Sequence, residues 1–134
     1  MSAEKVHAEW VRDQVFILKD RNDFPILMAQ PGGVNAADLL PLSLIGCASY
    51  DVIAILRKQR QQLARLEVSA ESEREDEPPW RIKKITICYR LAGSSLDPVR
   101  VRRAVELTER KYCSIYATLS LAVEITSEFE IEDP

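Results

Sequence analysis

Two cysteines lie far apart in the sequence, each within an apolar segment of helical character. Cys47 lies in LLPLSLIGCASYDVIAIL and Cys113 lies in AVELTERKYCSIYATLSLA. Such segments carry a thiol into or beside a packed core rather than onto a loop. Thiols from two distant helices meet only in the folded protein, where they either perform redox chemistry or fill space, since cysteine is among the residue types most often buried. The residues alone leave both alternatives open.

The other candidates for chemistry are few. Cys88 shares one face of an alternating segment with Lys84 and Arg90, and we expect it to lie on the outer face of a sheet as a small residue. His7 is the only histidine, which excludes histidine-based triads and most zinc sites. The cysteines lack the close spacing of zinc-binding pairs, so the sequence predicts no metal site.

The composition is that of an ordinary globular protein. The chain has 134 residues, 46% of them hydrophobic and 29% charged, which fits one domain over residues 1–134. A net charge of −3 gives no reason to expect nucleic acid or an anionic membrane as a partner. The start MSAEKVHAEW does not resemble a signal peptide, and no apolar stretch is expected to reach the ~18 to 20 residues that span a bilayer. We therefore expect a cytoplasmic protein, in which a disulfide would be a transient of a reaction cycle.

The first half of the chain is expected to contain three strands and a long helix. The strands are predicted at residues 5–10, 14–19 and 25–29, with the first two forming a hairpin. Asn35 is a plausible N-cap of a helix that runs to about Arg60. The helix is apolar nearly all round in its first half, as expected of a buried central helix. Pro41 should kink it or displace its start.

The second half is expected to contain two long strands, two helices and a closing strand. Residues 66–72 and 81–91 alternate between apolar and polar, and Asp97-Pro98 is a strong helix start. The inward stripe of that helix is predicted to be Val101, Ala104, Val105, Thr108 and Tyr112. A shorter helix follows Cys113, and the last strand turns Ile125 inward. The order β-β-β-α-β-β-α-α-β, with hairpins, predicts an α+β fold with antiparallel sheets packed around the central helix.

These segments together resemble a known family. GGVNAADLLPLSLIGCASYDVIAILRKQR, the strand pair and SSLDPVRVRRAVELTERKYCSIYATL resemble the OsmC/Ohr family of osmotically inducible and organic hydroperoxide resistance proteins. The likeness covers nearly the whole chain. Its most specific parts are GC followed by YDVIAILRK, and AVELTERKYCS, and each places a cysteine at the family position. The chain looks closest to the OsmC-like branch.

The resemblance implies a fold and an activity. The fold would be an intertwined homodimer with two active sites at the subunit interface. The activity would be thiol-dependent reduction of organic hydroperoxides: Cys47 attacks the peroxide and becomes a sulfenic acid, and Cys113 condenses with it to a disulfide. A small dithiol or a lipoylated protein would restore both thiols, without flavin, haem or metal.

The resemblance also implies supporting residues around an ionised thiol. The family's peroxidases use an arginine from the N-terminal region and a glutamate before the central helix. Ala37 stands at the glutamate position, Asp38 matches a second acidic position, and Arg12 and Arg21 are the nearest arginines. The alternative is an OsmC-like protein without peroxidase activity that binds a small apolar or thiol ligand at the dimer interface.

Overall fold

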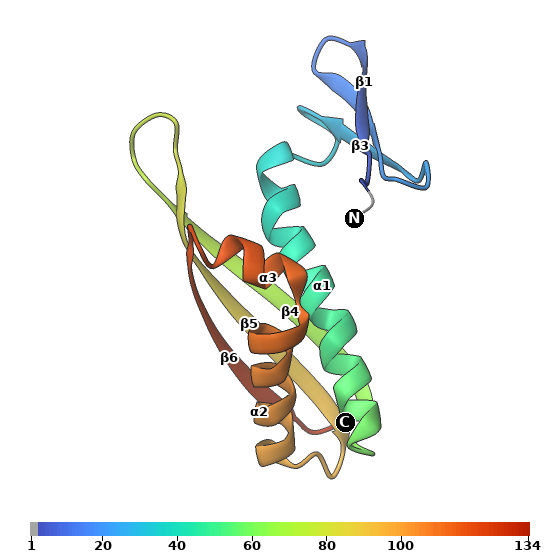
Figure 1. Cartoon of the computed structure of the whole chain (residues 1–134), viewed down its shortest axis with the longest axis vertical. Coiled ribbons are helices and arrows are strands. Elements are labelled where there is room, and N and C mark those ends of the chain that lie inside the picture. Colours follow the sequence, from blue (N-terminus) through green and yellow to red (C-terminus); the bar gives the residue numbers. More distant parts are fainter. Residues whose placement is uncertain (1–2) are drawn as a thin grey trace. The chain divides into compact units, whose positions relative to one another are not determined.

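The computed structural model describes residues 3–134 (Figure 1). The chain forms two compact units, the first ending at Leu40 and the second running from Pro41 to Pro134. The elements follow the predicted order of three strands, a helix, two strands, two helical segments and a strand. The α+β class is confirmed.

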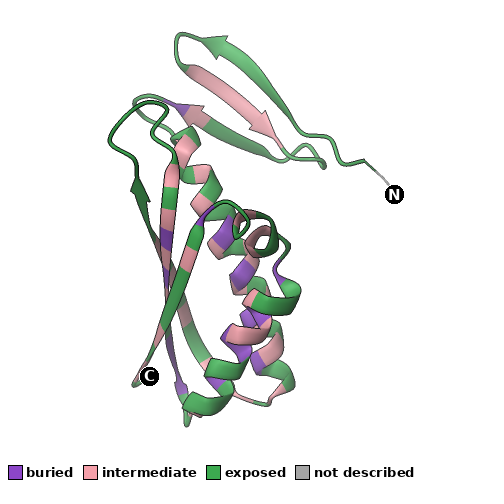
Figure 2. Cartoon of the chain, turned by 60° about the vertical axis from the view of Figure 1, so that its left-hand side comes forward, coloured by how far each residue is buried: buried purple, intermediate pink, exposed green. Residues whose placement is uncertain are grey.

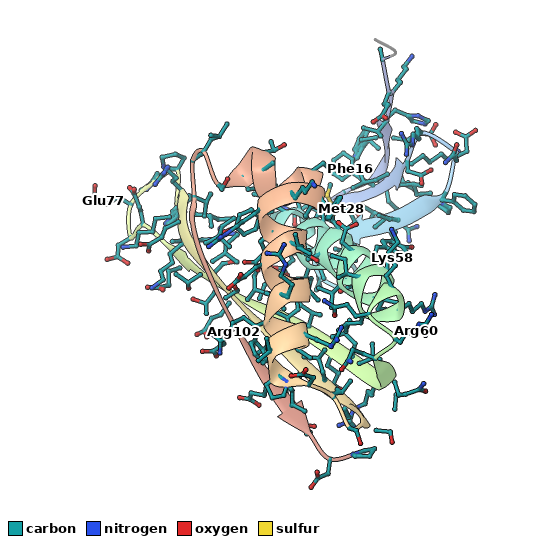
Figure 3. The ribbon with its side chains drawn as sticks, turned by 60° about the horizontal axis from the view of Figure 1, so that its bottom comes forward. Phe16, Met28, Lys58, Arg60, Glu77 and Arg102 are labelled. Atoms are coloured by element: carbon teal, nitrogen blue, oxygen red, sulfur yellow. The ribbon has the colours of Figure 1, made fainter. Side chains whose placement is uncertain are left out.

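The N-terminal unit is a three-stranded antiparallel sheet. Its strands are β1 (His7–Arg12), β2 (Val15–Lys19) and β3 (Pro25–Ala29), paired in that order. The β1–β2 hairpin turns at Asp13, whose positive φ of 44° suits an aspartate in a tight turn. Phe16 on β2 lies opposite Met28 on β3 (Figure 3). The three predicted strands are confirmed.

The helix α1 (Ala36–Lys58) begins where the capping residue predicts. Asn35 Oδ1 accepts a hydrogen bond of 2.9 Å from the backbone N–H of Ala37. The expected displacement of the start by Pro41 is wrong, because the helix continues through this residue. A proline in the second turn removes only the N–H that would pair with the carbonyl of Ala37.

Only one stripe of α1 is buried. Leu44, Ala48, Val52 and Leu56 recur every four residues, and all have no exposed surface. Leu42 is 50% exposed and Tyr50 is 82% exposed, so the expectation of a helix buried on all sides is wrong for the single chain. The expectation that no stretch is long and apolar enough to cross a membrane is also wrong, since α1 meets both criteria by length and composition.

The second unit is built on a three-stranded sheet in the order β4 (Gln62–Arg74), β5 (Ile82–Ser94) and β6 (Glu124–Glu132). β4 and β5 are antiparallel as predicted, but β6 is parallel to β5. The chain returns to the sheet through a helical crossover, and such a connection brings the next strand back in the same direction. The predicted inner face of β5 is confirmed, because Ile85, Ile87, Tyr89 and Leu91 are fully buried.

Helices cover one face of this sheet (Figures 1 and 2). They are α1, α2 (Pro98–Leu107), the π-helix η1 (Thr108–Tyr112) and α3 (Ser114–Leu119). Asp97 caps α2 by accepting a 3.0 Å hydrogen bond from Val99 N–H, as predicted. The prediction that Tyr112 faces inward is wrong, since it is 52% exposed. The wider π-turn, closed by Cys113 N–H donating to Thr108 O at 2.8 Å, shifts the residues after it away from the α-helical stripe.

Candidate active site

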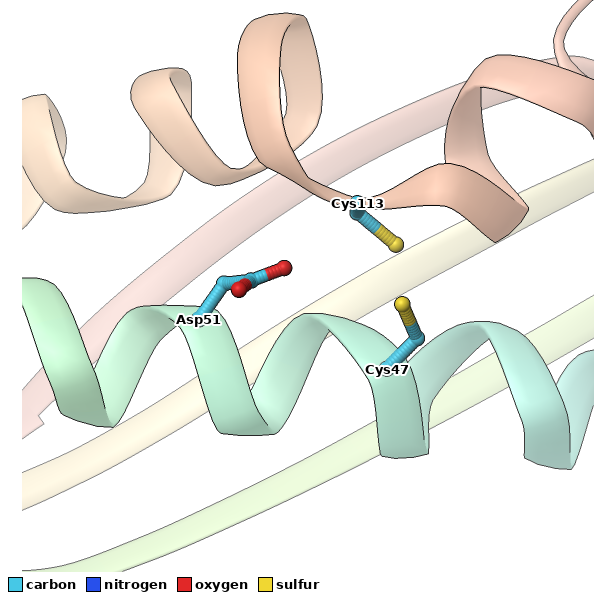
Figure 4. A group of neighbouring side chains, drawn as sticks. All are labelled: Cys47, Asp51 and Cys113. Carbon is cyan, nitrogen blue, oxygen red and sulfur yellow. The ribbon is translucent and has the colours of Figure 1, made fainter. Parts of the chain in front are cut away.

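The fold brings Cys47 and Cys113 together with a carboxylate. The Sγ atoms of both cysteines and one side-chain oxygen of Asp51 all lie within 4.8 Å of one another (Figure 4). All three cysteines of the chain are free thiols. We call Cys47, Asp51 and Cys113 the thiol cluster. The cluster joins two residues of one helix to a third that follows 62 positions after Asp51.

Two local features of the chain position these side chains. Cys47 and Asp51 are four residues apart on α1, so they lie on one side of the helix, one above the other. Cys113 lies between η1 and α3 in an extended conformation, with φ −78° and ψ 107°. It serves as the N-cap of α3, and its Sγ accepts the N–H of Tyr116 at 3.4 Å. The interruption of the helix at this residue therefore turns the second thiol toward α1.

Burial keeps Cys113 protonated. The residue is 2% exposed. Loss of solvent is the largest cause that raises the pKa of the Cys113 thiol to about 11, and its hydrogen bond with Cys47 acts in the same direction. The N–H of Tyr116 opposes the change by favouring the thiolate. At neutral pH Cys113 is therefore a thiol that can respond to a neighbouring sulfur rather than attack first.

A partly buried hydrogen-bond network anchors the segment that carries Cys113. The hydroxyl of Tyr89 on β5 donates to Glu109 Oε2 at 2.9 Å, and the hydroxyl of Ser127 on β6 donates to Glu109 Oε1 at 2.9 Å. Burial raises the pKa of the Glu109 carboxyl, while both hydrogen bonds work against that change. Glu109 belongs to η1, so the network ties the π-helix to two strands and fixes the position of Cys113.

An open groove of about 450 Å³ adjoins the thiol cluster. Asp51 belongs to both, so the groove borders the cluster at this carboxylate. Lys58 and Arg103 supply positive charge, and Gln59 Oε1 is buried without a hydrogen-bond partner among the described residues. The other lining residues are Ala54, Ile55, Leu107 and Tyr112.

The remaining predicted residues lie outside this cluster or in the N-terminal unit. Arg12 ends β1, Arg21 forms an ion pair with Glu4, and Asp38 is an exposed acid in the first turn of α1. The roles of Arg12 and Asp38 beside the thiols stay predictions. Cys88 lies on the outer face of the second sheet, as expected. Burial and then the charges of Glu130 and Glu128 raise the pKa of its thiol, against the opposing charge of Arg90.

Asp51 is the functional candidate that sequence reasoning missed. The sequence contains a signal for this residue, because an acid four residues after a cysteine lies on the same helix face as the cysteine. The family resemblance implies acids before Cys47, at positions 37 and 38. The structure shows that the acid after Cys47 is the one within reach of both sulfurs.

Comparison with known proteins places this site within a family. A sequence model described as OsmC-like protein matches residues 29–128, which include the whole thiol cluster. Protein YhfA from Escherichia coli strain K12 is 33% identical over 130 residues, covering 95% of this chain and 97% of YhfA.

Solved structures share the fold over nearly the full length. A hypothetical protein from Aquifex aeolicus VF5 superposes with a TM-score of 0.90 at 25% identity, over 100% of this chain and 99% of that one. The organic hydroperoxide resistance protein OhrB of Bacillus subtilis has the same fold, with a TM-score of 0.65 at 13% identity over 96% and 98% of the two chains. The chain therefore belongs to the OsmC-like protein family.

Proposed function

We propose that the protein is a thiol-dependent peroxidase that reduces organic hydroperoxides through Cys47 and Cys113. Membership of the OsmC-like family supports a role in redox or peroxide chemistry. The observation that carries the finer proposal is the meeting of two free thiols within 4.8 Å, from segments 66 residues apart. A pair at this separation can form a disulfide after a small side-chain movement.

In the first step, the Cys47 sulfur attacks the terminal oxygen of the hydroperoxide. The S–O bond forms, the O–O bond breaks, and the sulfur is oxidised to a sulfenic acid while the peroxide is reduced to an alcohol. The proton of the Cys47 thiol passes to Asp51, within 4.8 Å, directly or through a water, and then to the departing alkoxide. Asp51 thus ends the step as it began, as a carboxylate.

In the second step, Cys113 attacks the sulfenic sulfur of Cys47. The S–S bond forms, the S–O bond breaks, and the proton from Cys113 leaves with the hydroxide as water. The high pKa of Cys113 suits this order, because a protonated thiol waits until its neighbour becomes electrophilic. An external dithiol, free or on a lipoylated protein, then reduces the disulfide and is itself oxidised.

The family resemblance gives the proposed thiolate supporting charges. A thiolate in apolar surroundings needs a nearby cation, and each unit by which its pKa falls corresponds to about 1.4 kcal/mol. Arg12 is the candidate that the resemblance offers for this role, with Asp38 as a supporting acid. Substitution of Arg12 by alanine should slow the first step and leave disulfide formation from a preformed sulfenic acid unchanged.

We further propose that the protein acts as a cytoplasmic homodimer. OsmC/Ohr proteins are commonly homodimers. Leu42 and Tyr50 project from the open side of α1, and Trp10 and Phe24 are exposed in the N-terminal unit. A second copy that covers these side chains would remove a large apolar surface from water. Sedimentation at micromolar concentration should give twice the mass of the chain, and Tyr50→Glu should shift it toward the monomer.

A second candidate function is the binding of a small ligand without turnover. The groove beside Asp51 favours it, because apolar Ile55 and Leu107 lie near the basic Lys58 and Arg103. Such a site suits a small molecule with an apolar body and a negative end. On this reading the thiols would stay reduced when a hydroperoxide is added.

The test of the proposed function is turnover of cumene hydroperoxide with dithiothreitol as reductant. Cys47→Ser should abolish turnover, and Cys88→Ser, a matched loss of one thiol, should leave it unchanged. In Cys113→Ser a sulfenic acid should accumulate at Cys47 and react with dimedone. Turnover by Cys47→Ser at the rate of the unmodified protein would refute the proposal.

A further inference from the structure

We propose that Cys47, Asp51 and Cys113 form a binding site for a thiophilic divalent metal ion of the Zn²⁺ class. Two thiolates and one carboxylate are a ligand set that zinc accepts. This inference goes beyond the peroxidase proposal, because it requires no peroxide, no oxidation and no second subunit. It uses only the three side chains that the fold places together.

The distances within the thiol cluster fit one ion. Three atoms that lie no more than 4.8 Å apart all fall within roughly 2.8 Å of one common point, against ~2.3 Å for Zn–S and ~2.0 to 2.2 Å for Zn–O. Side-chain rotations that move each ligand atom by about half an ångström therefore close the coordination sphere. Cys47 and Asp51 already share one helix face, so two of the three ligands come from one rigid element.

The surroundings also fit a metal site. The N–H of Tyr116 points at Cys113 Sγ from 3.4 Å, and such a donor stabilises a metal-bound thiolate in the outer shell. Asp51 lines an open groove, so the carboxylate end of the cluster is accessible from solvent. Three protein ligands leave a fourth position for water or a small ligand, which is the arrangement of open rather than structural zinc sites.

Binding is a simple exchange of protons for metal. The ion displaces the protons of Cys47 and Cys113, forms two S–metal bonds and one O–metal bond, and releases two protons to solvent. No electron moves. The spacing of the cysteines in the sequence argued against a zinc site, because it lacks the close cysteine pairs of known zinc motifs. In the folded chain, Cys47 and Asp51 at i,i+4 and the remote Cys113 nevertheless bring three ligand atoms together.

The experiment is a titration of the fully reduced protein with Co²⁺ alone, without oxygen, followed by Zn²⁺. We expect thiolate-to-cobalt charge-transfer bands and tetrahedral d–d bands that saturate at one ion per chain and disappear when Zn²⁺ displaces cobalt. About two protons per ion should be released in weak buffer. Cys47→Ser and Cys113→Ser should each weaken binding at least 100-fold, and Asp51→Asn about 10- to 100-fold. Cys88→Ser should bind as the unmodified protein does.

Several results would overturn the site. These are a cobalt spectrum without charge-transfer bands, full affinity in Asp51→Asn, or loss of binding in Cys88→Ser. Circular dichroism and thermal unfolding of each variant separate loss of a ligand from loss of the fold, and Asp51→Asn tests the site even if Cys113→Ser unfolds. The titration contains no hydroperoxide, and the peroxidase assay is run with a chelator added, so failure of one leaves the other standing.

Discussion

Formation of the Cys47–Cys113 disulfide should stabilise the folded protein against denaturant. The bond would close a loop of about 66 residues. The chain-entropy relation for a loop of this length gives about 4 kcal/mol of stabilisation through the unfolded state. The sulfurs start within 4.8 Å and must approach to ~2.05 Å, so strain in the folded state takes back part of this gain. We expect a net increase of about 2 to 4 kcal/mol in the free energy of unfolding.

The assay is guanidinium unfolding of the reduced protein and of protein oxidised with one equivalent of cumene hydroperoxide. The midpoint should rise on oxidation, and dithiothreitol should restore the first curve. Cys88→Ser should show the same increase, whereas Cys47→Ser and Cys113→Ser should show none. An unchanged or lower midpoint in protein that carries the mapped bridge would contradict this prediction, because it would mean that the thiols meet only at the expense of the native packing.

Three further predictions follow from the pKa of Cys113, the Glu109 network and the core stripe of α1. Burial raises the pKa of Cys113 from 9.0 to about 11, so iodoacetamide should alkylate it at pH 8 ~100-fold more slowly than in the unfolded chain, as site-resolved mass spectrometry would show. Because the folded state holds the Cys113 proton more tightly than the unfolded chain, the contribution of this thiol to the free energy of unfolding is complete below pH 9 and falls as the pH rises toward 11. An alkylation rate of Cys113 that is half-maximal near pH 9 would contradict both statements. Glu109→Ala should destabilise the fold by about 1 to 3 kcal/mol in urea because it leaves the Tyr89 hydroxyl buried without its acceptor, and Glu109→Gln should recover part of that loss. Leu44→Ala should cost about 2 to 5 kcal/mol because Leu44 is fully buried, whereas Leu121→Ala, at a position 90% exposed, should change the urea midpoint little; equal costs would contradict the assigned core.

Local signals in the sequence predicted most elements of the fold. The side chains of Asn35 and Asp97 mark helix starts because they accept the first free N–H groups, and both caps are present. The inner face of β5 follows from strict alternation, which places Ile85 and Tyr89 on one side of the strand. These features depend on neighbours in the chain, so the sequence specifies them directly.

Features that depend on tertiary context were not predictable in the same way. The π-turn that exposes Tyr112 has no simple residue pattern, since it arises where a helix must adjust to its packing. The parallel direction of β6 is set by the crossover that precedes it rather than by its own residues. The single buried stripe of α1 could not be foreseen either, because an all-round apolar pattern does not say which side the chain itself covers.

The candidate site was half predictable. The apolar helical segments around both cysteines predicted that the thiols lie in or beside the core. The family resemblance implied that the two thiols react with each other. Their approach to within 4.8 Å is a property of the fold, as is the presence of Asp51 beside them. An acid four residues after a cysteine occurs on many helices, so this spacing alone does not indicate a site. Asp51 becomes a functional candidate because the fold also places Cys113 beside it.

The most direct test of the central claim is to add one equivalent of cumene hydroperoxide to the reduced protein, count free thiols and map the linkage by mass spectrometry. We expect rapid loss of two of the three thiols, a Cys47–Cys113 bridge and an unmodified Cys88. Three thiols that stay free, or a bridge that includes Cys88, would contradict it.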